Sequence, residues 1–187
     1  YPVDKHTIQS LYHLEHINDP FIAALRDALD AEQKAMMRLV IFFHDIGKGR
    51  RGNHSDIGAK IFKAYATKLG FSTQAIQDGS TLIKHHTLMS NIANRENIYN
   101  DKVVLSFVSK LQSIKILNML YVLTYADING VGEKIYTNFT AKLLKDLYEV
   151  SVKSFENPEL IGEAGKRIRR ENLLKKSEAF QKLKPIM

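Results

Sequence analysis

Residues 36–48 read MMRLVIFFHDIGK, an almost unbroken apolar run that ends in a histidine, an aspartate, a glycine and a lysine. Such a run, apolar on nearly every side, predicts a central and buried helix. We expect this helix to span about residues 32–46, with Gly47 as its C-terminal stop. Asp45 would then lie at the negative end of a helix dipole and be partly desolvated, which is costly without a compensating cation. The stretch therefore predicts a cation bound beside His44 and Asp45.

The rest of the sequence favours helices and gives only weak strand signals. Capping residues indicate where helices start, and apolar residues recur at helical spacing after them. The expected helices begin after Asp19, at Asn53 or Ser55 and at Ser72, and further ones span about 103–108, 113–128 and 134–155, with an Asn-rich loop at 91–100. These signals predict an all-α fold.

The composition is that of one ordinary globular domain. With 187 residues, 44% of them hydrophobic and 25% charged, the chain is long enough to bury a hydrophobic core. It has no cysteine, which excludes disulfides and thiolate zinc sites and agrees with a reducing cytoplasm. No apolar run reaches the roughly 18 residues that cross a bilayer, so we expect no membrane contact.

The basic charge is concentrated in the C-terminal tail. Of the net charge of +7, the residues from Val152 onward carry +4. We interpret them as a solvated helical face and expect no nucleic-acid partner. We expect one domain at residues 1–155 and a charged amphipathic helix or linker at 156–187, which leads to a missing C-terminal domain. The first residue, Tyr1, is not an initiator methionine, and we expect the chain to be a piece of a longer protein.

Histidines and aspartates gather at the expected helix ends and loops. Besides His44 and Asp45, the candidate ligands are His6, His54, His85, His86 and Asp127. Imidazoles and carboxylates without sulfur suit Mn, Fe, Co, Ni or Zn, and carboxylates with water also suit Mg. Seven candidates exceed one tetrahedral site, so we expect two adjacent divalent ions. We predict that one pocket gathers five of them: His6, His44, Asp45, His85 and Asp127.

Each candidate also has an ordinary explanation. A lone histidine such as His54 is commonly a surface residue, and Asp127 could be a hydrogen-bonding residue at a helix end. His13 and His16 lack the placement of the others, and we do not assign them to the site. If Asp45 and Asp127 lie together without metal, we expect their repulsion to raise at least one pKa and to destabilise the metal-free protein.

The loop at residues 47–52, GKGRRG, separates two of the candidate ligands and combines glycines with three cations. Glycines permit close approach of the backbone to a ligand, and Lys48, Arg50 and Arg51 suit phosphate oxygens. The loop lacks the spacing of a nucleotide P-loop. Lys48 could instead complement the C-terminus of the preceding helix.

Five short motifs carry a resemblance to a known family. They are VDKH at 3–6, FHDIGKG at 43–49, HSDIGA at 54–59, HHTLMS at 85–90 and LTYADINGVG at 123–132. The order of their histidines and aspartates resembles that of the HD-domain metal phosphohydrolases. Within that group the sequence is similar, over about residues 1–150, to the HD domain of bifunctional uridylyltransferase/uridylyl-removing enzymes.

The resemblance implies an HD-domain helical bundle around a metal site that removes UMP from a uridylylated tyrosine of the nitrogen-regulatory PII protein. It also implies a nucleotidyltransferase domain and ACT domains elsewhere in the same chain. All seven candidates would be metal ligands, with Asp45 as the bridging carboxylate. Water activated by the metal would attack phosphorus in line, and the tyrosyl phenolate, whose conjugate acid has a pKa of about 10, would leave. Lys48 and Arg51 would stabilise charge on the phosphoryl oxygens.

Three other functions stay open. One is hydrolysis of a free nucleotide or a cyclic dinucleotide, although the Gly-Tyr-Pro signature of the cyclic-di-GMP branch is absent after His85 and His86. A second is a non-catalytic regulatory module, which the loss of any of the seven ligands would have favoured. A third is nucleic-acid binding through the basic tail.

Overall fold

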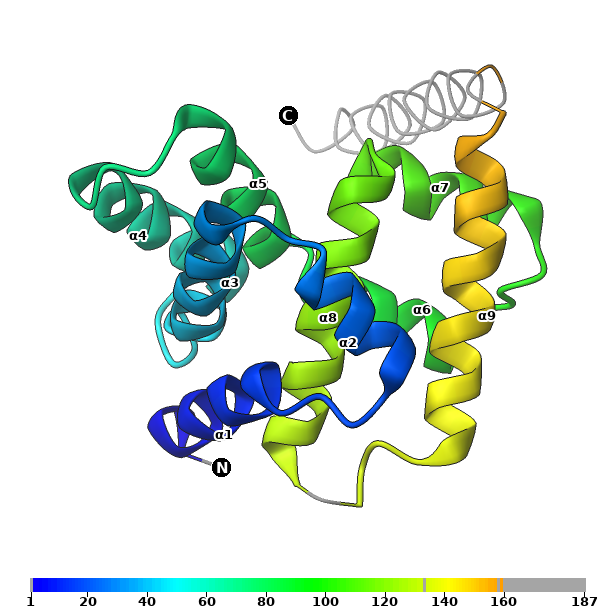
Figure 1. Ribbon diagram of the computed structural model, residues 1–187, viewed down its shortest axis with the longest axis horizontal. Helices are drawn as coiled ribbons and strands as arrows, with labels where there is room; N and C mark the ends of the chain where they lie inside the picture. The colour runs from blue at the N-terminus through cyan, green and yellow to red at the C-terminus, as the bar shows by residue number, and fades with distance from the viewer. Residues whose placement is uncertain (1, 133, 158, 160–187) are drawn as a thin grey trace, which may run out of the picture.

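The computed structural model describes residues 2–132, 134–157 and 159. These residues form nine helices and no strand (Figure 1). The helices are α1 (Val3–Glu15), α2 (Pro20–Asp27), α3 (Ala31–Phe43), α4 (His54–Lys68), α5 (Thr73–Lys84), α6 (Leu88–Arg95), α7 (Asp101–Leu111), α8 (Ile114–Val131) and α9 (Asn138–Phe155). The prediction of an all-α fold is confirmed.

Side-chain caps fix several of the predicted helix starts. Asp19, Asn53, Ser72 and Ser113 accept hydrogen bonds from backbone N–H groups in the first turns of α2, α4, α5 and α8, respectively. Such caps satisfy donors that have no partner inside the helix. Because Asn53 caps α4, His54 is held at the first position of that helix.

Helices α3 and α8 end at residues other than those predicted, and both ends bear on the candidate ligands. Helix α3 ends at Phe43, earlier than expected, so His44 and Asp45 lie in the turns that follow it. Helix α8 continues to Val131, so Asp127 lies about one turn before its end rather than at the end.

Helix α6 occupies part of the segment that was predicted as an Asn-rich loop. Met89 and Ala93, four residues apart, are buried on one face, and Asn94 donates its side-chain amide to the carbonyl of Ser90. Burial of that apolar face outweighs the weak helix propensity of asparagine. The prediction of a loop was therefore wrong for residues 91–95.

Helix α8 runs through the middle of the molecule (Figure 1). It packs against α1, α2, α3, α5, α6, α7 and α9. Leu117, Leu120 and Leu123 have no exposed surface, and buried residues occupy every side of the helix. Helix α3 is buried on one face only, through Met36, Met37, Val40, Ile41 and Phe43, and Phe42 is 52% exposed, so the prediction that it is buried on nearly every side was wrong. The helix surrounded on all sides is thus α8, and it supplies Asp127 from the core.

Helix α1 crosses α8 at a glycine. A Cβ on Gly130 would lie 2.1 Å from the Oγ of Ser10 and 3.0 Å from its backbone nitrogen, so only glycine permits this approach. Ser10 itself has no exposed surface. The close crossing places His6, one turn before Ser10, next to Asp127.

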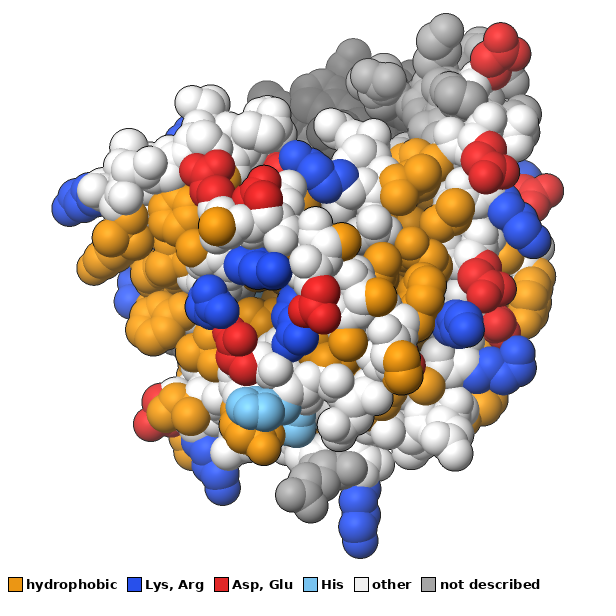
Figure 2. Space-filling model, in the orientation of Figure 1, with side chains coloured by type: hydrophobic (Ala, Val, Ile, Leu, Met, Phe, Trp, Pro, Cys, Tyr) orange, Lys and Arg blue, Asp and Glu red, His pale blue; other side chains and the backbone are white. Residues whose placement is uncertain are grey.

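Charged side chains of both signs are interspersed on the face seen in Figure 2. Within the described residues, no single helix has the length and apolar composition to cross a membrane, and α7 and α8 meet these requirements only as a pair bent by 98°. The predicted amphipathic helix at 156–187 lies outside the described residues, apart from 156, 157 and 159. The predicted domain boundary therefore stays a prediction.

Replacing Gly130 by alanine is expected to destabilise the fold by about 1–3 kcal/mol, as overpacking typically does. The added methyl would push α1 away from α8, as its distances to Ser10 show. Urea denaturation of the variant measures the loss. Gly132→Ala is the matched control, because its Cβ would come no closer than 3.9 Å to a side chain and its backbone is extended. Equal stability of the two variants would contradict the role of the close crossing.

Candidate metal centre

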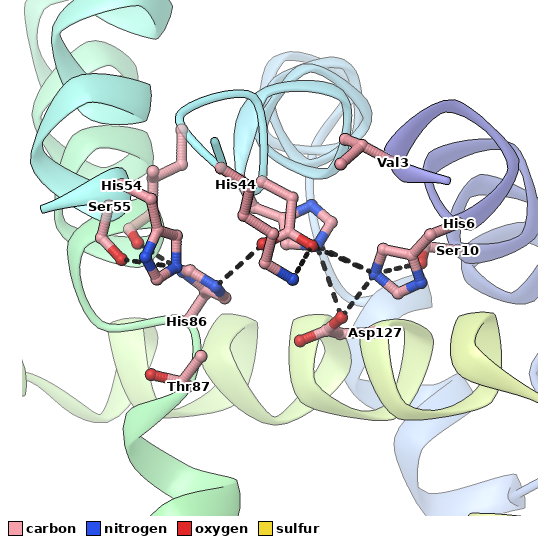
Figure 3. Close-up of polar contacts among 12 residues, drawn as sticks. Val3, His6, Ser10, His44, His54, Ser55, His86, Thr87 and Asp127 are labelled. Atoms are coloured by element: carbon pink, nitrogen blue, oxygen red, sulfur yellow. Dashed lines mark hydrogen bonds and ion pairs between the residues drawn. The ribbon is translucent and has the colours of Figure 1, made fainter. Parts of the chain in front are cut away.

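Four side chains from three separate segments of the chain meet at one point (Figure 3). The Nε2 of His6, from α1, lies 2.8 Å from the Oδ1 of Asp127, from α8, and 3.2 Å from the Nε2 of His44. The Nε2 of His44 lies 3.3 Å from the same oxygen of Asp127. The Oδ2 of Asp45 lies 3.7 Å from the Nε2 of His6 and 3.6 Å from that of His44. These atoms form the first ligand group: His6, His44, Asp45 and Asp127.

The other oxygen of Asp45 faces a second group of imidazoles. The Oδ1 of Asp45 lies 3.5 Å from the Nε2 of His86, and the rings of His54 and His86 have centroids 5.3 Å apart. Asp45, His54 and His86 offer ligand atoms that all lie within 4.8 Å of one another, as do those of His6, His44 and Asp45. Asp45 therefore belongs to both groups and presents one oxygen to each.

Backbone carbonyls orient two of the imidazoles. The Nδ1 of His44 lies 2.6 Å from the carbonyl oxygen of Ile41, and the Nδ1 of His86 lies 2.8 Å from that of Ile83. A carbonyl only accepts, so each Nδ1 carries the hydrogen, and in the neutral ring the lone pair is on Nε2. Such an outer hydrogen bond is typical of metal-binding histidines. It leaves the Nε2 atoms that face Asp45 as the ligand atoms.

The donor set fits divalent metal. His6, His44 and Asp45 are at most 1% exposed, and His86 is 2% exposed. Among the described residues, the Oδ1 of Asp45 has no hydrogen-bond donor, although the Nε2 of His86 is near. Buried polar atoms normally have partners, so an oxygen in this position calls for one. Nitrogen and carboxylate ligands without sulfur suit Mn, Fe, Zn and related ions.

The imidazoles and a lysine hold both carboxylates in the charged form. Burial opposes this most strongly, but His86, His44 and Lys48 outweigh it and lower the pKa of Asp45 to about 2. Burial likewise opposes the charged form of Asp127. The hydrogen bonds from His44 and His6 outweigh the effect of burial, so the pKa of Asp127 lies far below its ordinary value. Against its own burial, the pKa of His44 is raised by the hydrogen bond and charge of Asp127. The expectation that repulsion between the carboxylates would raise a pKa was wrong, because cations and imidazoles surround both.

Lys48 contacts the site, whereas Arg50 and Arg51 lie on the surface of the same loop. The Nζ of Lys48 lies 2.5 Å from the Oδ2 of Asp45. The side chain of Lys48 is 40% exposed, so it reaches Asp45 from the solvent side. Arg50 and Arg51 are both exposed. Lys48 thus occupies the mouth of the site, and the two arginines extend from it.

Gly47 brings the loop against the start of α4. A Cβ on Gly47 would lie 2.1 Å from the carbonyl oxygen of His54, so this backbone contact requires glycine. The prediction that Gly47 stops the preceding helix was wrong, since α3 ends at Phe43 and His44 follows it as the C-cap. The contact holds His54 close to Asp45, which follows α3.

His85 is the predicted ligand that the structure leaves apart. Within the described residues it contributes to neither ligand group, whereas its neighbour His86 contributes to the second. Burial, together with the charges of Lys110 and Lys84, lowers the pKa of His85. His16 is exposed and bonds the carbonyl of Tyr12. The structure thus brings together six of the seven predicted ligands.

Two serines beside the imidazoles had no signal in the sequence. The Oγ of Ser10 lies 3.5 Å from the Nε2 of His6, and the Oγ of Ser55 lies 3.4 Å from the Nε2 of His54. Both serines are buried. Serine is common in helices of every kind, so only the position of Ser10 one turn after His6, and of Ser55 directly after His54, could have indicated them.

Adding Mn²⁺ is expected to raise the melting temperature, because a ligand that binds only the folded state stabilises it by mass action. At about 100 times the dissociation constant the gain is about 2.7 kcal/mol. Asp45→Asn and His86→Ala should reduce the shift, since both remove ligand atoms. His16→Ala, at an exposed histidine outside both groups, is the control and should keep the full shift. Melting temperatures that no divalent ion changes would contradict the site.

In the metal-free protein, the contribution of this cluster to the free energy of unfolding is expected to be largest between about pH 4 and pH 6.5. The lowered pKa values of Asp45 and Asp127 give stabilisation that is lost as the pH falls through the folded-state values, about 2 for Asp45. The raised pKa of His44 gives stabilisation that is complete below about 6.5 and is lost as the pH rises through its folded-state value.

Asp127→Asn tests this pH dependence. In EDTA at pH 5.5 the variant should be less stable than the wild type by about 1.5–3 kcal/mol, the usual contribution of a charge-assisted hydrogen bond. Urea denaturation at several pH values should show the difference shrinking at pH 3 and again above the pKa of His44. A difference that stays constant from pH 3 to pH 8 would rule out the assigned charges.

Comparison with known proteins agrees with this geometry. The HD domain family matches residues 3–127. The chain is 34% identical over 161 residues to the bifunctional uridylyltransferase/uridylyl-removing enzyme of Cereibacter sphaeroides, covering 83% of this chain and 17% of that protein. Proteins of the same name from Rhodospirillum rubrum and Azospirillum brasilense are 35% and 33% identical, over 79% and 90% of this chain and 16% and 18% of theirs. The chain thus spans about one sixth of the length of these relatives, and it belongs to the HD domain family.

Proposed function

We propose that this chain is a metal-dependent phosphohydrolase that removes UMP from a uridylylated tyrosine of a PII-type nitrogen-regulatory protein. The observation that carries the proposal is the position of Asp45, whose two oxygens face two separate groups of buried imidazoles. The choice of substrate rests on the similarity to proteins named uridylyl-removing enzymes.

Six residues would hold two divalent ions, of Mn, Mg, Fe or Zn, with Asp45 between them. His6, His44 and Asp127 would complete the first group, and His54 and His86 the second. Bound divalent metal supplies Lewis acidity and lowers the pKa of water, so that a nucleophile is available near neutral pH. His85 is left out of the proposed set because it contributes to neither group.

The protein's own part is to position charge and to exclude water. His6, His44 and Asp45 are buried, so these ligand residues are shielded from solvent. Lys48, at the solvent side, pairs with Asp45 in the structure described and would pair with a phosphoryl oxygen when a substrate is bound. Arg50 and Arg51 would attract the phosphate from the same loop. A tyrosyl leaving group has a pKa of about 10 and needs no full protonation, so we assign no general acid.

The partner would be a uridylylated PII-type protein, and the remaining parts of the chain would be those implied by the names of the relatives. These proteins are called bifunctional uridylyltransferase/uridylyl-removing enzymes, and the present chain corresponds to about one sixth of their length. We therefore propose that a uridylyltransferase activity belongs to another part of the same protein, where the resemblance of the motifs also implies ACT domains.

Asp45→Asn is expected to abolish UMP release from the uridylylated protein while leaving the helical fold intact. The substitution keeps the shape of the side chain but removes the charge that would hold two cations, so the rate should fall by orders of magnitude. Lys48→Ala should be milder, with a loss of about 10²–10³-fold, as for removal of one stabilising donor. Chromatography of released UMP, with Mn²⁺ present, measures both rates.

Asp101→Asn, at an exposed aspartate in the first turn of α7, is the matched control and should keep the wild-type rate. Circular dichroism checks that Asp45→Asn remains folded. Wild-type rates in the folded Asp45→Asn variant would refute the metal-dependent reaction. A wild type that cleaves only free nucleotides would keep the hydrolase and refute the substrate.

A further inference from the structure

A pocket of about 400 Å³ opens between α1 and the C-terminal end of α8, beside the candidate metal centre. His6 lines this pocket and also belongs to the first ligand group. Gln9, Tyr12 and Asn129 line it as well. Figure 1 shows α1 lying across that end of α8. The pocket therefore adjoins the candidate metal centre at His6.

The pocket offers hydrogen-bonding groups next to an aromatic surface. Asn129 donates its Nδ2 to the carbonyl of Tyr125 at 2.9 Å, which orients its Oδ1 as the acceptor available to a ligand. Gln9 is exposed on α1 and offers both a donor and an acceptor. Tyr12 is 54% exposed, and its ring is stacked on that of His16 with centroids 4.3 Å apart, which holds it in place. Such a lining suits a flat heterocycle with polar edges.

We propose that this pocket binds the nucleoside of the substrate, a pyrimidine ribonucleoside, with Gln9 and Asn129 as the residues that recognise the edge of the base. Tyr12 would supply the aromatic contact. The inference rests on the proposed function, in which the phosphorus carries two substituents, a uridine and a tyrosyl residue. It assigns the uridine to the side of α1 and α8, and the protein-bound tyrosine to the open side at residues 47–52.

The chemistry of the two substituents indicates which of them, the uridine or the tyrosyl residue, fits the pocket. The ring of a tyrosyl ester has no donor or acceptor along its edge, so it would displace water from the amides of Gln9 and Asn129 without replacing the hydrogen bonds of that water, which disfavours binding. Uracil has two carbonyl oxygens and one N–H, which match a mixed set of amide donors and acceptors. The volume of the pocket also lies in the range of small-molecule sites, whereas a folded protein needs an open surface.

The test is the binding of UMP and of ribose 5-phosphate to the Mn²⁺-loaded protein, measured by isothermal titration calorimetry. Both ligands carry the same phosphate and sugar, so only the base differs. UMP is expected to bind more tightly than ribose 5-phosphate. Gln9→Ala and Asn129→Ala should each weaken UMP by about 2–10-fold, the usual effect of one hydrogen bond, and leave ribose 5-phosphate unchanged. Ile8→Ala, at a 65% exposed residue of α1 that does not line the pocket, is the control and should change neither.

Equal affinities for UMP and ribose 5-phosphate would overturn the proposal, as would variants that weaken both ligands alike. Release of UMP from the uridylylated protein separates this inference from the proposed function. If UMP binds selectively but the protein substrate is not cleaved, the pocket stands and the proposed function fails. If cleavage occurs and Gln9→Ala and Asn129→Ala leave its KM unchanged, the pocket assignment fails. If they raise KM without changing kcat, both stand.

Discussion

The buried carboxylate of Asp45 is the feature on which the arrangement of this domain depends. A carboxylate with 1% exposure is stable in a protein only if positive charge or hydrogen-bond donors surround it. Here they come from α1, from the turns after α3, from the loop that follows, and from His86, the second residue after the end of α5. Elements far apart in the sequence thus meet around one side chain, and the groups that they bring there form a site that fits two cations.

Glycines make this convergence possible by allowing backbones to approach. Gly130 lets α1 reach α8, which brings His6 to Asp127. Gly47 lets the loop reach the start of α4, which holds His54 near Asp45. Gly58 serves the same purpose at the end of α3, because a Cβ there would lie 2.8 Å from the carbonyl oxygen of Phe43. At Gly47 and Gly58 the nearest atoms are backbone, and at Gly130 they are the Oγ and the backbone nitrogen of Ser10.

Two sets of positively charged partners suit the carboxylates of the site: Lys48 with the imidazoles, and divalent cations. In the structure described, Lys48 and the imidazoles neutralise Asp45 and Asp127, and they keep the pKa values of both low. The same oxygens and Nε2 atoms would hold divalent cations, in which case the imidazoles would be neutral and Lys48 would be free to pair with another anion. The lysine is thus suited both to stabilise the metal-free domain and to bind the phosphate of a substrate. This dual role follows from its position at the solvent side of the site.

The sequence by itself determined the helical class, most helix starts and six of the residues that converge, because caps, apolar spacing and ligand chemistry are local properties of the chain. It also indicated the family, through short motifs around those residues. It could not distinguish His86 from His85, since adjacent residues at the end of α5 point in different directions and only the packing of that helix decides which one faces Asp45. It predicted a loop where α6 forms, because asparagine has a weak helix propensity. The burial of one face of α6 against neighbouring helices, which the sequence does not show, outweighs that propensity. It also gave the wrong sign for the pKa values of the carboxylates. That sign depends on distances between groups as far apart in the chain as His6 and Asp127, and only the tertiary structure sets those distances.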